Sequence, residues 1–563
     1  MNQLFLRLNF FTGAPKERSD RLLSLILLIY GLAALLAIVL PVSVLIHRSL
    51  HNTKGVYVGL ENYVNYFSTQ SLFSSFFNSV FVAGITSLIV IPIAFLYAYG
   101  LTRTHMRFKG FFRAIAFIPL LIPGILKAIA LIYLFGNQGL FKDYLFGHSI
   151  YGPLGVITAS VVWTFPHAAL IMLTAMLHAD QRLYHAAETL FASKTRTFLT
   201  VTWPTCRYGV ITAFLVVFIS VFTDFGIAKV IGGDFNILAT DIYKEVVGLQ
   251  NFEMGAVISV VLMIPAILVF GLERMVASKQ SSQLTAKSTP YQAKQSFGRD
   301  LFYFIFCSLI SLCILGMLGM AQYAALIKFW PYNLSLTLQN YVFQIEGVGW
   351  SNFTNSLLLS VLTASFGTAI SFLGAYIVEK PNHDSALRKV LQMLMLFPMA
   401  IPGLVLGLAY LLFINQQGNP FGFLYGGMSI LVISTITHLY SVPHLTALTA
   451  LKGLDKEIEA VGKSLNTPFW RLFSRVTIPV CLPAIFDIWI YLFLGSMTTL
   501  SAVIFLYTSE TMLASIAVIH IDETGRVASA AAMAMLIVYA CLTVRLLHYV
   551  VTTKIIKKSI NWR

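Results

Sequence analysis

Apolar stretches long enough to cross a membrane recur along the whole sequence and are separated by short polar segments. An α-helix rises about 1.5 Å per residue, so roughly 20 apolar residues cross the hydrocarbon core. The pattern predicts an all-α polytopic membrane protein with about twelve transmembrane helices. The predicted spans are 22–46, 77–101, 111–136, 151–178, 208–230, 253–275, 300–326, 354–378, 389–414, 426–451, 484–506 and 526–550.

Motifs of the first half recur in order in the second half. Asn78-Ser79 opens a span and is repeated by Asn355-Ser356, and an Ile-Pro-Gly sequence at 122–124 is repeated at 401–403. The offset is 277 residues for the first pair and 279 for the second. Six spans in each half give both halves the same orientation. This predicts two parallel repeats related by an axis along the membrane normal.

The repeats are predicted to cover residues 1–275 and 300–563. The segment 276–299 between them is rich in Ser, Gln, Lys and Thr. This composition is typical of a flexible linker. We therefore expect two tandem six-helix units joined on one side of the membrane.

Charge supports this interpretation and orients the chain. Only 11% of the residues are charged and 57% are hydrophobic, whereas soluble domains carry about 25% charged residues. With the N-terminus inside, the inner segments hold 30 of the 38 lysines and arginines. Basic residues gather in cytoplasmic loops, so both termini are predicted to be cytoplasmic. These basic loops explain the net charge of +15 without a nucleic-acid ligand. The cysteines form no CxxC pair, so no metal site is predicted from them.

Each half has one long basic loop between its fourth and fifth spans, at 179–207 and 452–483. Both resemble the EAA loop of ABC importer permeases, in which Glu-Ala-Ala is followed by Gly four residues later and then by an apolar-Pro pair. The resemblance implies short coupling helices that dock on an ATPase, each ended by its proline. The matching positions are His185, Ala186, Ala187, Phe191, Ala192 and Pro204 in the first loop, and Glu459, Ala460, Val461, Gly462, Asn466 and Pro479 in the second.

Both loops depart from that pattern. His185 and Ala460 stand at the Glu position, and Phe191 and Asn466 stand at the Gly position. Asn tolerates a positive φ but Phe does not. We therefore expect the first coupling helix to bend differently or to dock less tightly. The alternative for either loop alone is an ordinary basic loop.

Hydrolysis of ATP is not expected in this chain. A Gly-Lys-Ser sequence at 462–464 lacks the earlier glycine of a phosphate-binding loop, because Glu457 stands there. The chain is thus predicted to be a transport subunit without catalytic residues or a cofactor of its own. The resemblance implies two copies of a separate ATPase, which binds ATP and Mg²⁺, and a periplasmic solute-binding protein. It also implies the bacterial inner membrane and the type I importer fold.

Polar residues inside the predicted spans mark a candidate translocation path, because a charge at the bilayer centre costs about 2.5–3.5 kcal/mol. A polar path with lysines that attract an anion is one interpretation. An ion pair between Lys127 and Asp224 and an interfacial position of Lys229 are the alternatives. Each Pro-Gly break frees backbone carbonyls, which favours pore lining, a gate or a structural kink. The candidates are Lys127, Thr223, Asp224, Lys229, Thr498, Thr499, Pro123, Gly124, Pro402 and Gly403.

Further segments narrow the resemblance to one group of ABC importer permeases. Residues 222–233, 238–244, 250–256 and 501–507 are similar to the 2-aminoethylphosphonate permease family. This similarity implies that the solute is an organophosphonate. The ferric-iron importer permeases share the fused architecture and are the alternative within the class. An ion-coupled secondary transporter is the alternative from a different class.

Overall fold

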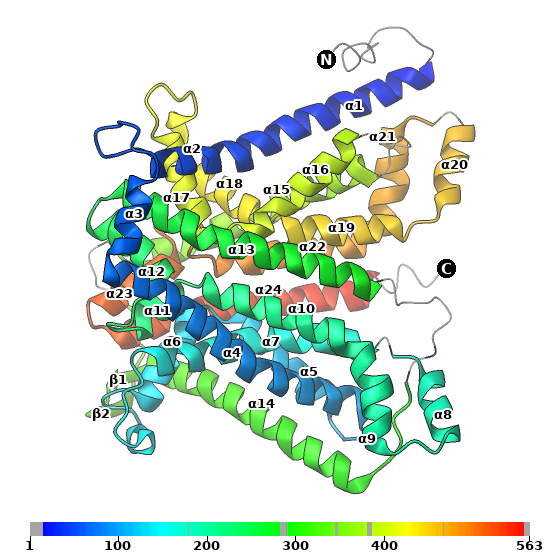
Figure 1. Ribbon diagram of the computed structural model, residues 1–563, viewed down its shortest axis with the longest axis horizontal. Coiled ribbons are helices and arrows are strands. Elements are labelled where there is room, and N and C mark those ends of the chain that lie inside the picture. The colour runs from blue at the N-terminus through cyan, green and yellow to red at the C-terminus, as the bar shows by residue number, and fades with distance from the viewer. Residues whose placement is uncertain are drawn as a thin grey trace.

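The computed structural model describes residues 15–177, 179–281, 289, 291–343, 347–379, 386–465 and 467–556. Long helices lie side by side in one bundle (Figure 1). In the described part of the chain, nine helices are long and apolar enough to cross a membrane, or twelve if each bent pair is one span. The prediction of an all-α membrane protein with about twelve spans is confirmed.

The first half is built from thirteen α-helices and five short 3-10 or π segments within the described residues. They are α1 (Pro15–Ala34), η2 (Leu35–Val39), α2 (Leu40–Ser49), α3 (Glu61–Ser68), α4 (Gln70–Arg103), α5 (Lys109–Phe117), η3 (Ile118–Leu121), α6 (Gly124–Phe135), η4 (Lys142–Leu145), α7 (Pro153–Leu177), α8 (Gln181–Thr189), α9 (Lys194–Thr197), η5 (Phe198–Thr202), α10 (Trp203–Phe222), α11 (Gly226–Ile231), α12 (Leu238–Tyr243), η6 (Lys244–Gly248) and α13 (Phe252–Ser281).

The second half repeats this order and adds an antiparallel hairpin of β1 and β2. Its elements are α14 (Phe297–Leu326), β1 (Ile327–Phe329), β2 (Asn333–Leu336), η7 (Gln339–Tyr341), α15 (Trp350–Glu379), α16 (Ala386–Leu396), η8 (Phe397–Ala400), α17 (Gly403–Ile414), η9 (Gly422–Leu424), α18 (Met428–Leu439), α19 (Ser441–Lys452), α20 (Lys456–Ser464), α21 (Phe469–Leu472), η10 (Phe473–Thr477), α22 (Ile478–Met497), α23 (Ala514–Glu523), α24 (Val527–Val550) and η11 (Val551–Ile556).

The first helix of each half packs on the other half. Helix α2 contacts α17 of the second half, and α14, which opens the second half, contacts α6 and α4 of the first. The hydroxyl of Tyr410 in α17 donates to the carbonyl of Ala37 at 2.6 Å. Tyr30 of α1 forms a hydrogen bond with Tyr440 beside α19. The two halves are therefore interlocked rather than merely adjacent.

The repeated Asn-Ser pair fixes the same joint in both halves. Ser79 Oγ accepts the backbone N–H of Leu238 at 2.9 Å, and Ser356 Oγ accepts that of Ala514 at 2.8 Å. Leu238 and Ala514 are the first residues of α12 and α23, whose N–H groups have no partner within the helix. The asparagine before each serine donates to a carbonyl just ahead of that helix, at 2.9 and 3.1 Å. A side chain from another helix thus acts as the N-cap.

We expect Ser79→Ala and Ser356→Ala each to lower the free energy of unfolding by about 1–3 kcal/mol, because each leaves a buried N–H without an acceptor. The measurement is reversible unfolding in mixed detergent. The control is Ser74→Ala on the exposed face of α4, which should change stability by less than about 0.5 kcal/mol. Equal losses in all three variants would contradict this role for the repeated serines.

Several predicted boundaries are wrong. The fifth span of each half begins well before residues 208 and 484, because the helices run unbroken over Lys194–Phe222 and Phe469–Met497. The predicted linker 276–299 is shorter at both ends, since α13 continues to Ser281 and α14 begins at Phe297. Apolar content marks where a helix enters lipid, and these helices extend beyond it.

Both ends of the described chain, Pro15 and Ile556, lie at the end of the bundle that carries α8 and α20 (Figure 1). The β1–β2 hairpin lies at the opposite end. An even number of crossings produces this arrangement. The residues beyond these two ends lie outside the described part, and their predicted cytoplasmic location stays a prediction.

Candidate coupling loops and transmembrane breaks

Each predicted coupling loop begins with a capped helix. Asp180 is the N-cap of α8, and its carboxylate accepts the backbone N–H of Arg182 at 3.0 Å. This bond and those from Thr289 hold the pKa of the Asp180 carboxyl below its ordinary value. At the matching place in the second half, Asp455 accepts the N–H of Glu457 at 3.0 Å. Sequence reasoning missed this Asp pair, although its offset of 275 residues was visible.

The two coupling helices also end in equivalent turns. The N–H of Ala192 donates to the carbonyl of Ala187 at 2.9 Å, and that of Thr467 donates to Gly462 at 2.9 Å. These are the closing bonds of a Schellman turn. Phe191 adopts the left-handed conformation, φ 51°, that such a turn needs. Phe191 thus forms this turn at a strain of about 1–2 kcal/mol. Because Asn466 lies outside the described residues, the expectation that the first helix bends differently or docks less tightly stays a prediction.

One face of each coupling helix is apolar and exposed. On the first loop it is formed by Leu183, Leu190 and Phe191, and the Phe191 side chain is 96% exposed. On the second loop the exposed apolar side chains are Val461 and Leu465. At the repeat offset of 275 residues, Leu465 matches Leu190, whereas Val461 matches Ala186. Tyr184 and Ala187, on the adjacent face of α8, are buried. Each loop therefore presents a small apolar ridge of the kind that fits a groove on a partner.

Other positions of the predicted motif lie on the helix surface or cannot be placed. His185, at the Glu position, lies 3.6 Å from the carboxylate of Glu188 one turn later on α8. Glu459 and Ala460 belong to α20, but their side chains lie outside the described residues, as does all of Asn466. The structure thus leaves the second Glu and Gly positions unassigned.

The two loop prolines do not end the coupling helices, which corrects a prediction. Helix α8 ends at Thr189, well before Pro204. Pro204 and Pro479 are each the second residue of a long α-helix, directly after the π segments η5 and η10. A proline lacks the N–H that continues a helix. The widened π turn accommodates that missing donor, so the helix continues through it.

The polar residues that end the fifth spans serve the helix ends. The hydroxyls of Thr223 and Thr498 donate to carbonyls four residues earlier, at 2.9 and 3.0 Å. Asp224 accepts the backbone N–H three residues later at 3.0 Å, in the first turn of α11. The carbonyl of Thr499 accepts the hydroxyl of Ser515 at 2.5 Å. Their place on a translocation path stays a prediction.

The two membrane lysines already have partners. The ammonium of Lys127 donates to the carbonyl of Ile122 at 2.8 Å, which is one of the groups freed by the Pro-Gly break. Lys229 pairs with Glu523 of the second half at 2.9 Å. Asp224 lies in the described part of the chain and makes no salt bridge with Lys127 there. The two side chains nevertheless interact electrostatically at longer range, so the Lys127–Asp224 ion pair, an alternative from the sequence, stays a prediction.

The Pro-Gly breaks are sharp turns, with helices bent by 102° in the first half and 107° in the second. They differ in the space around the glycine. A Cβ on Gly403 would lie 2.5 Å from Ser501 Oγ and 3.0 Å from the ring of His438. A Cβ on Gly124 would meet Ile227 at an ordinary 3.5 Å. The second break is therefore the more tightly packed.

A repeated Pro-His pair was overlooked in the sequence. His167 in α7 and His444 in α19 each follow a proline, at an offset of 277 residues. His444 Nδ1 forms a hydrogen bond with the Tyr440 hydroxyl at 3.0 Å, and Nδ1 of His167 is buried without a partner in the described structure. Among the described residues, no three His, Cys, Asp or Glu side chains are placed to hold a metal ion.

Comparison with protein families identifies the class. The family described as "Binding-protein-dependent transport system inner membrane component" matches residues 90–282 and again residues 367–557. The chain belongs to this family. It is a fused ABC permease, and one match falls in each half. The protein is therefore an inner-membrane transport subunit rather than a catalytic enzyme.

Individual relatives of this permease carry different names. A ferric transport system permease, FbpB of Actinobacillus pleuropneumoniae, is 24% identical over 83% of this chain and 69% of its own. An Fe(3+)-transport system permease of Haemophilus influenzae is 25% identical over 78% and 82%. A spermidine/putrescine permease PotC homologue of Mycoplasma genitalium is 29% identical over 32% and 61%. The first two are similar to this permease over both halves.

Proposed function

We propose that the permease carries solute inward and that ATPase subunits dock on its two coupling helices. The single observation that carries this proposal is that both coupling loops, at α8 and α20, present exposed apolar side chains. An ion-coupled transporter needs no such pair. Two ATPase copies would bind at the end of the bundle that holds both chain ends, on the cytoplasmic side. A periplasmic binding protein would deliver solute at the opposite end.

A hydrogen-bonded connection from the first coupling helix into the membrane supports this mechanism. The Tyr184 hydroxyl of α8 shares a 3.0 Å hydrogen bond with Thr202 of η5. From η5, one continuous helix runs to the Thr223–Asp224 break. When the ATPase dimer closes and moves α8, this helix transmits the motion to the centre of the membrane. The second half has a matching long helix from Phe469 to Met497.

For the solute we propose an organophosphonate such as 2-aminoethylphosphonate, supported by the resemblance of the four segments between residues 222 and 507. Ferric iron is the second candidate, supported by relatives named for ferric transport that align over most of the chain. Attraction of an anion by Lys127 and Lys229 no longer supports either one, because both lysines have protein partners.

Solute-stimulated ATP hydrolysis tests this proposal. The permease is reconstituted in lipid with its neighbouring ATPase and binding protein, and the rates with 2-aminoethylphosphonate and with ferric iron are compared. We expect stimulation by the phosphonate alone. Stimulation by iron alone would retain the mechanism and replace the solute. Uptake that persists without any ATPase would overturn the importer mechanism and favour an ion-coupled transporter.

A further inference from the structure

The segment between the two halves lies against the first coupling helix. The carbonyl of Thr289 accepts the N–H of Gln181 at 3.0 Å, and its hydroxyl donates to Asp180 Oδ1 at 3.0 Å. The N–H of Gln292 donates to the side-chain oxygen of Gln181 at 2.9 Å. These bonds meet at the capped start of α8. The composition predicted a flexible linker, but these described residues make specific contacts.

A tilted pair of tyrosine rings holds the middle of this segment. The ring of Tyr291 lies 4.5 Å from that of Tyr184 on the buried face of α8. The guanidinium of Arg103 stands 4.2 Å from the Tyr291 ring centroid and 5.2 Å from that of Tyr184. Arg103 is itself buried and donates to the carbonyl of Met176 at 2.9 Å. A desolvated cation between two rings is a strong contact.

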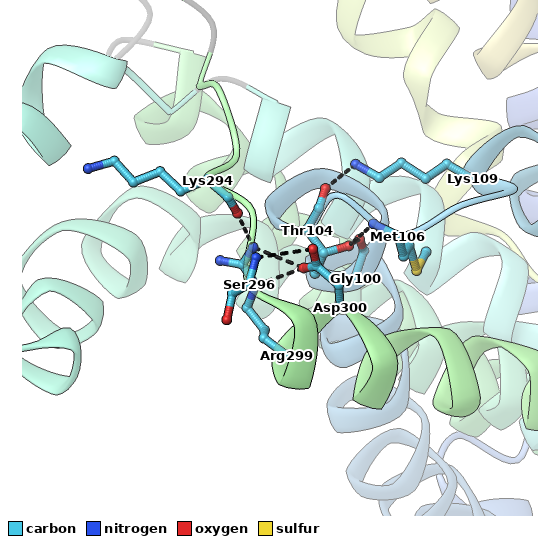
Figure 2. A network of polar contacts seen from close by, with 8 residues as sticks. All are labelled: Gly100, Thr104, Met106, Lys109, Lys294, Ser296, Arg299 and Asp300. Atoms are coloured by element: carbon cyan, nitrogen blue, oxygen red, sulfur yellow. Dashed lines mark hydrogen bonds and ion pairs between the residues drawn. The ribbon is translucent and has the colours of Figure 1, made fainter.

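The far end of the segment is anchored as well. Lys294 pairs with Glu188 in the last turn of α8 at 2.7 Å, which holds the pKa of that carboxyl below its ordinary value. Figure 2 shows the Lys294 ammonium pointing away from a network at the start of α14. In that network, Arg299 bonds both the Lys294 carbonyl and Asp300, and the N–H of Ser296 donates to Asp300. The segment is thus fixed at both ends.

The second coupling helix has a small cavity at the matching place. The cavity measures about 10 Å³ and its lining includes Tyr376, Asp455, Leu472 and Thr477. Asp455 and Thr477 are the repeat partners of Asp180 and Thr202, at an offset of 275 residues. The two coupling loops are alike in their own hydrogen bonds, and in the described part of the chain the bonds from Thr289 and Gln292 go to the first one.

We propose that Thr289 and Tyr291–Lys294 form a brace that positions and stiffens the first coupling helix. Brace residues act through α8 and are positioning residues. A helix that is already ordered loses less conformational freedom when it binds. The consequence for ATPase docking rests on the proposed function, whereas the stiffness of α8 does not.

Hydrogen exchange tests the stiffness without any partner. Exchange is measured in the full chain in lipid nanodiscs. Tyr291→Ala should accelerate exchange in α8 by about tenfold or more and leave α20 unchanged. Tyr291→Phe keeps the ring and should match the parent protein. No response of α8 to Tyr291→Ala, or an equal acceleration in α20, would overturn the brace.

Photo-crosslinking tests the consequence for docking. A photoreactive residue is placed at position 186 on α8 or at position 461 on α20, and the crosslink yield with the ATPase is measured. Tyr291→Ala should lower the yield at 186 several-fold but not at 461. An unchanged ratio would overturn the effect of the brace on docking. No crosslink at either site in the parent protein would overturn the proposed function, and the exchange result would still decide the brace.

Discussion

Replacing Phe191 with asparagine is expected to weaken ATPase binding by about 30-fold and to leave the fold as stable or slightly more stable. Phe191 adopts φ 51° and its side chain is 96% exposed, so no intramolecular contact explains a strained aromatic residue at this place. Asparagine tolerates this backbone conformation better. Aromatic anchors at the centre of an interface contribute about 2 kcal/mol or more, which corresponds to about 30-fold in affinity. The measurement is ATPase binding to the permease in nanodiscs.

The chain offers a matched control for this substitution. Phe146 has φ 50° and is also almost fully exposed, but it lies between α6 and α7, outside the coupling loops. Phe146→Asn relieves similar strain and should leave ATPase binding unchanged. Equal binding losses in the two variants, or none at Phe191, would remove this side chain from the docking face.

Alanine at Gly403 is expected to destabilise the permease by about 1–3 kcal/mol and to abolish most solute-stimulated hydrolysis. The added Cβ would lie 2.5 Å from Ser501 Oγ and 3.0 Å from the ring of His438. Overpacking of this kind forces side chains and backbone to shift. The shift would fall at a 107° turn between two helices, where the backbone can adjust little. Unfolding in mixed detergent and the reconstituted hydrolysis assay measure the two effects.

Gly124→Ala is the control, because it makes the same change at the equivalent break of the first half. Its Cβ would meet Ile227 at 3.5 Å, an ordinary contact. We expect less than about 0.5 kcal/mol of destabilisation and nearly normal hydrolysis. A loss at Gly124 as large as that at Gly403 would show that both turns need glycine for a reason other than packing.

Much of the fold could be predicted because lipid imposes a simple rule on apolar length. The spans followed from apolar runs, and the repeat followed from Asn78-Ser79 and the two Pro-Gly pairs. The purpose of the Asn-Ser pair was not predictable. Ser79 caps a helix that begins at Leu238, and no local pattern links residues so far apart.

The site was less predictable because its contacts, too, join residues that are far apart in the sequence. The partner of Lys229 is Glu523, in the other half of the chain, so a lysine near a span end was equally consistent with an interfacial position. Propensity indicated that Phe191 would disturb its turn, yet the hydrogen bonds of the turn formed with the strain retained. The segment around Tyr291 has the composition of a linker, and only its contacts with α8 show its order.

The packing of each half's first helix on the other half affects how the chain enters the membrane during synthesis. Helix α2 leaves the ribosome long before α17, on which it packs, has been made. Until then it must be stable in lipid without that partner. The span that contains it is the most apolar in the described part of the chain, and only a minor share of it is buried in the finished bundle. This helix therefore enters the membrane before it packs on α17. In the same way, the packing around α6 and α4 of the first half is complete only after α14 has been made.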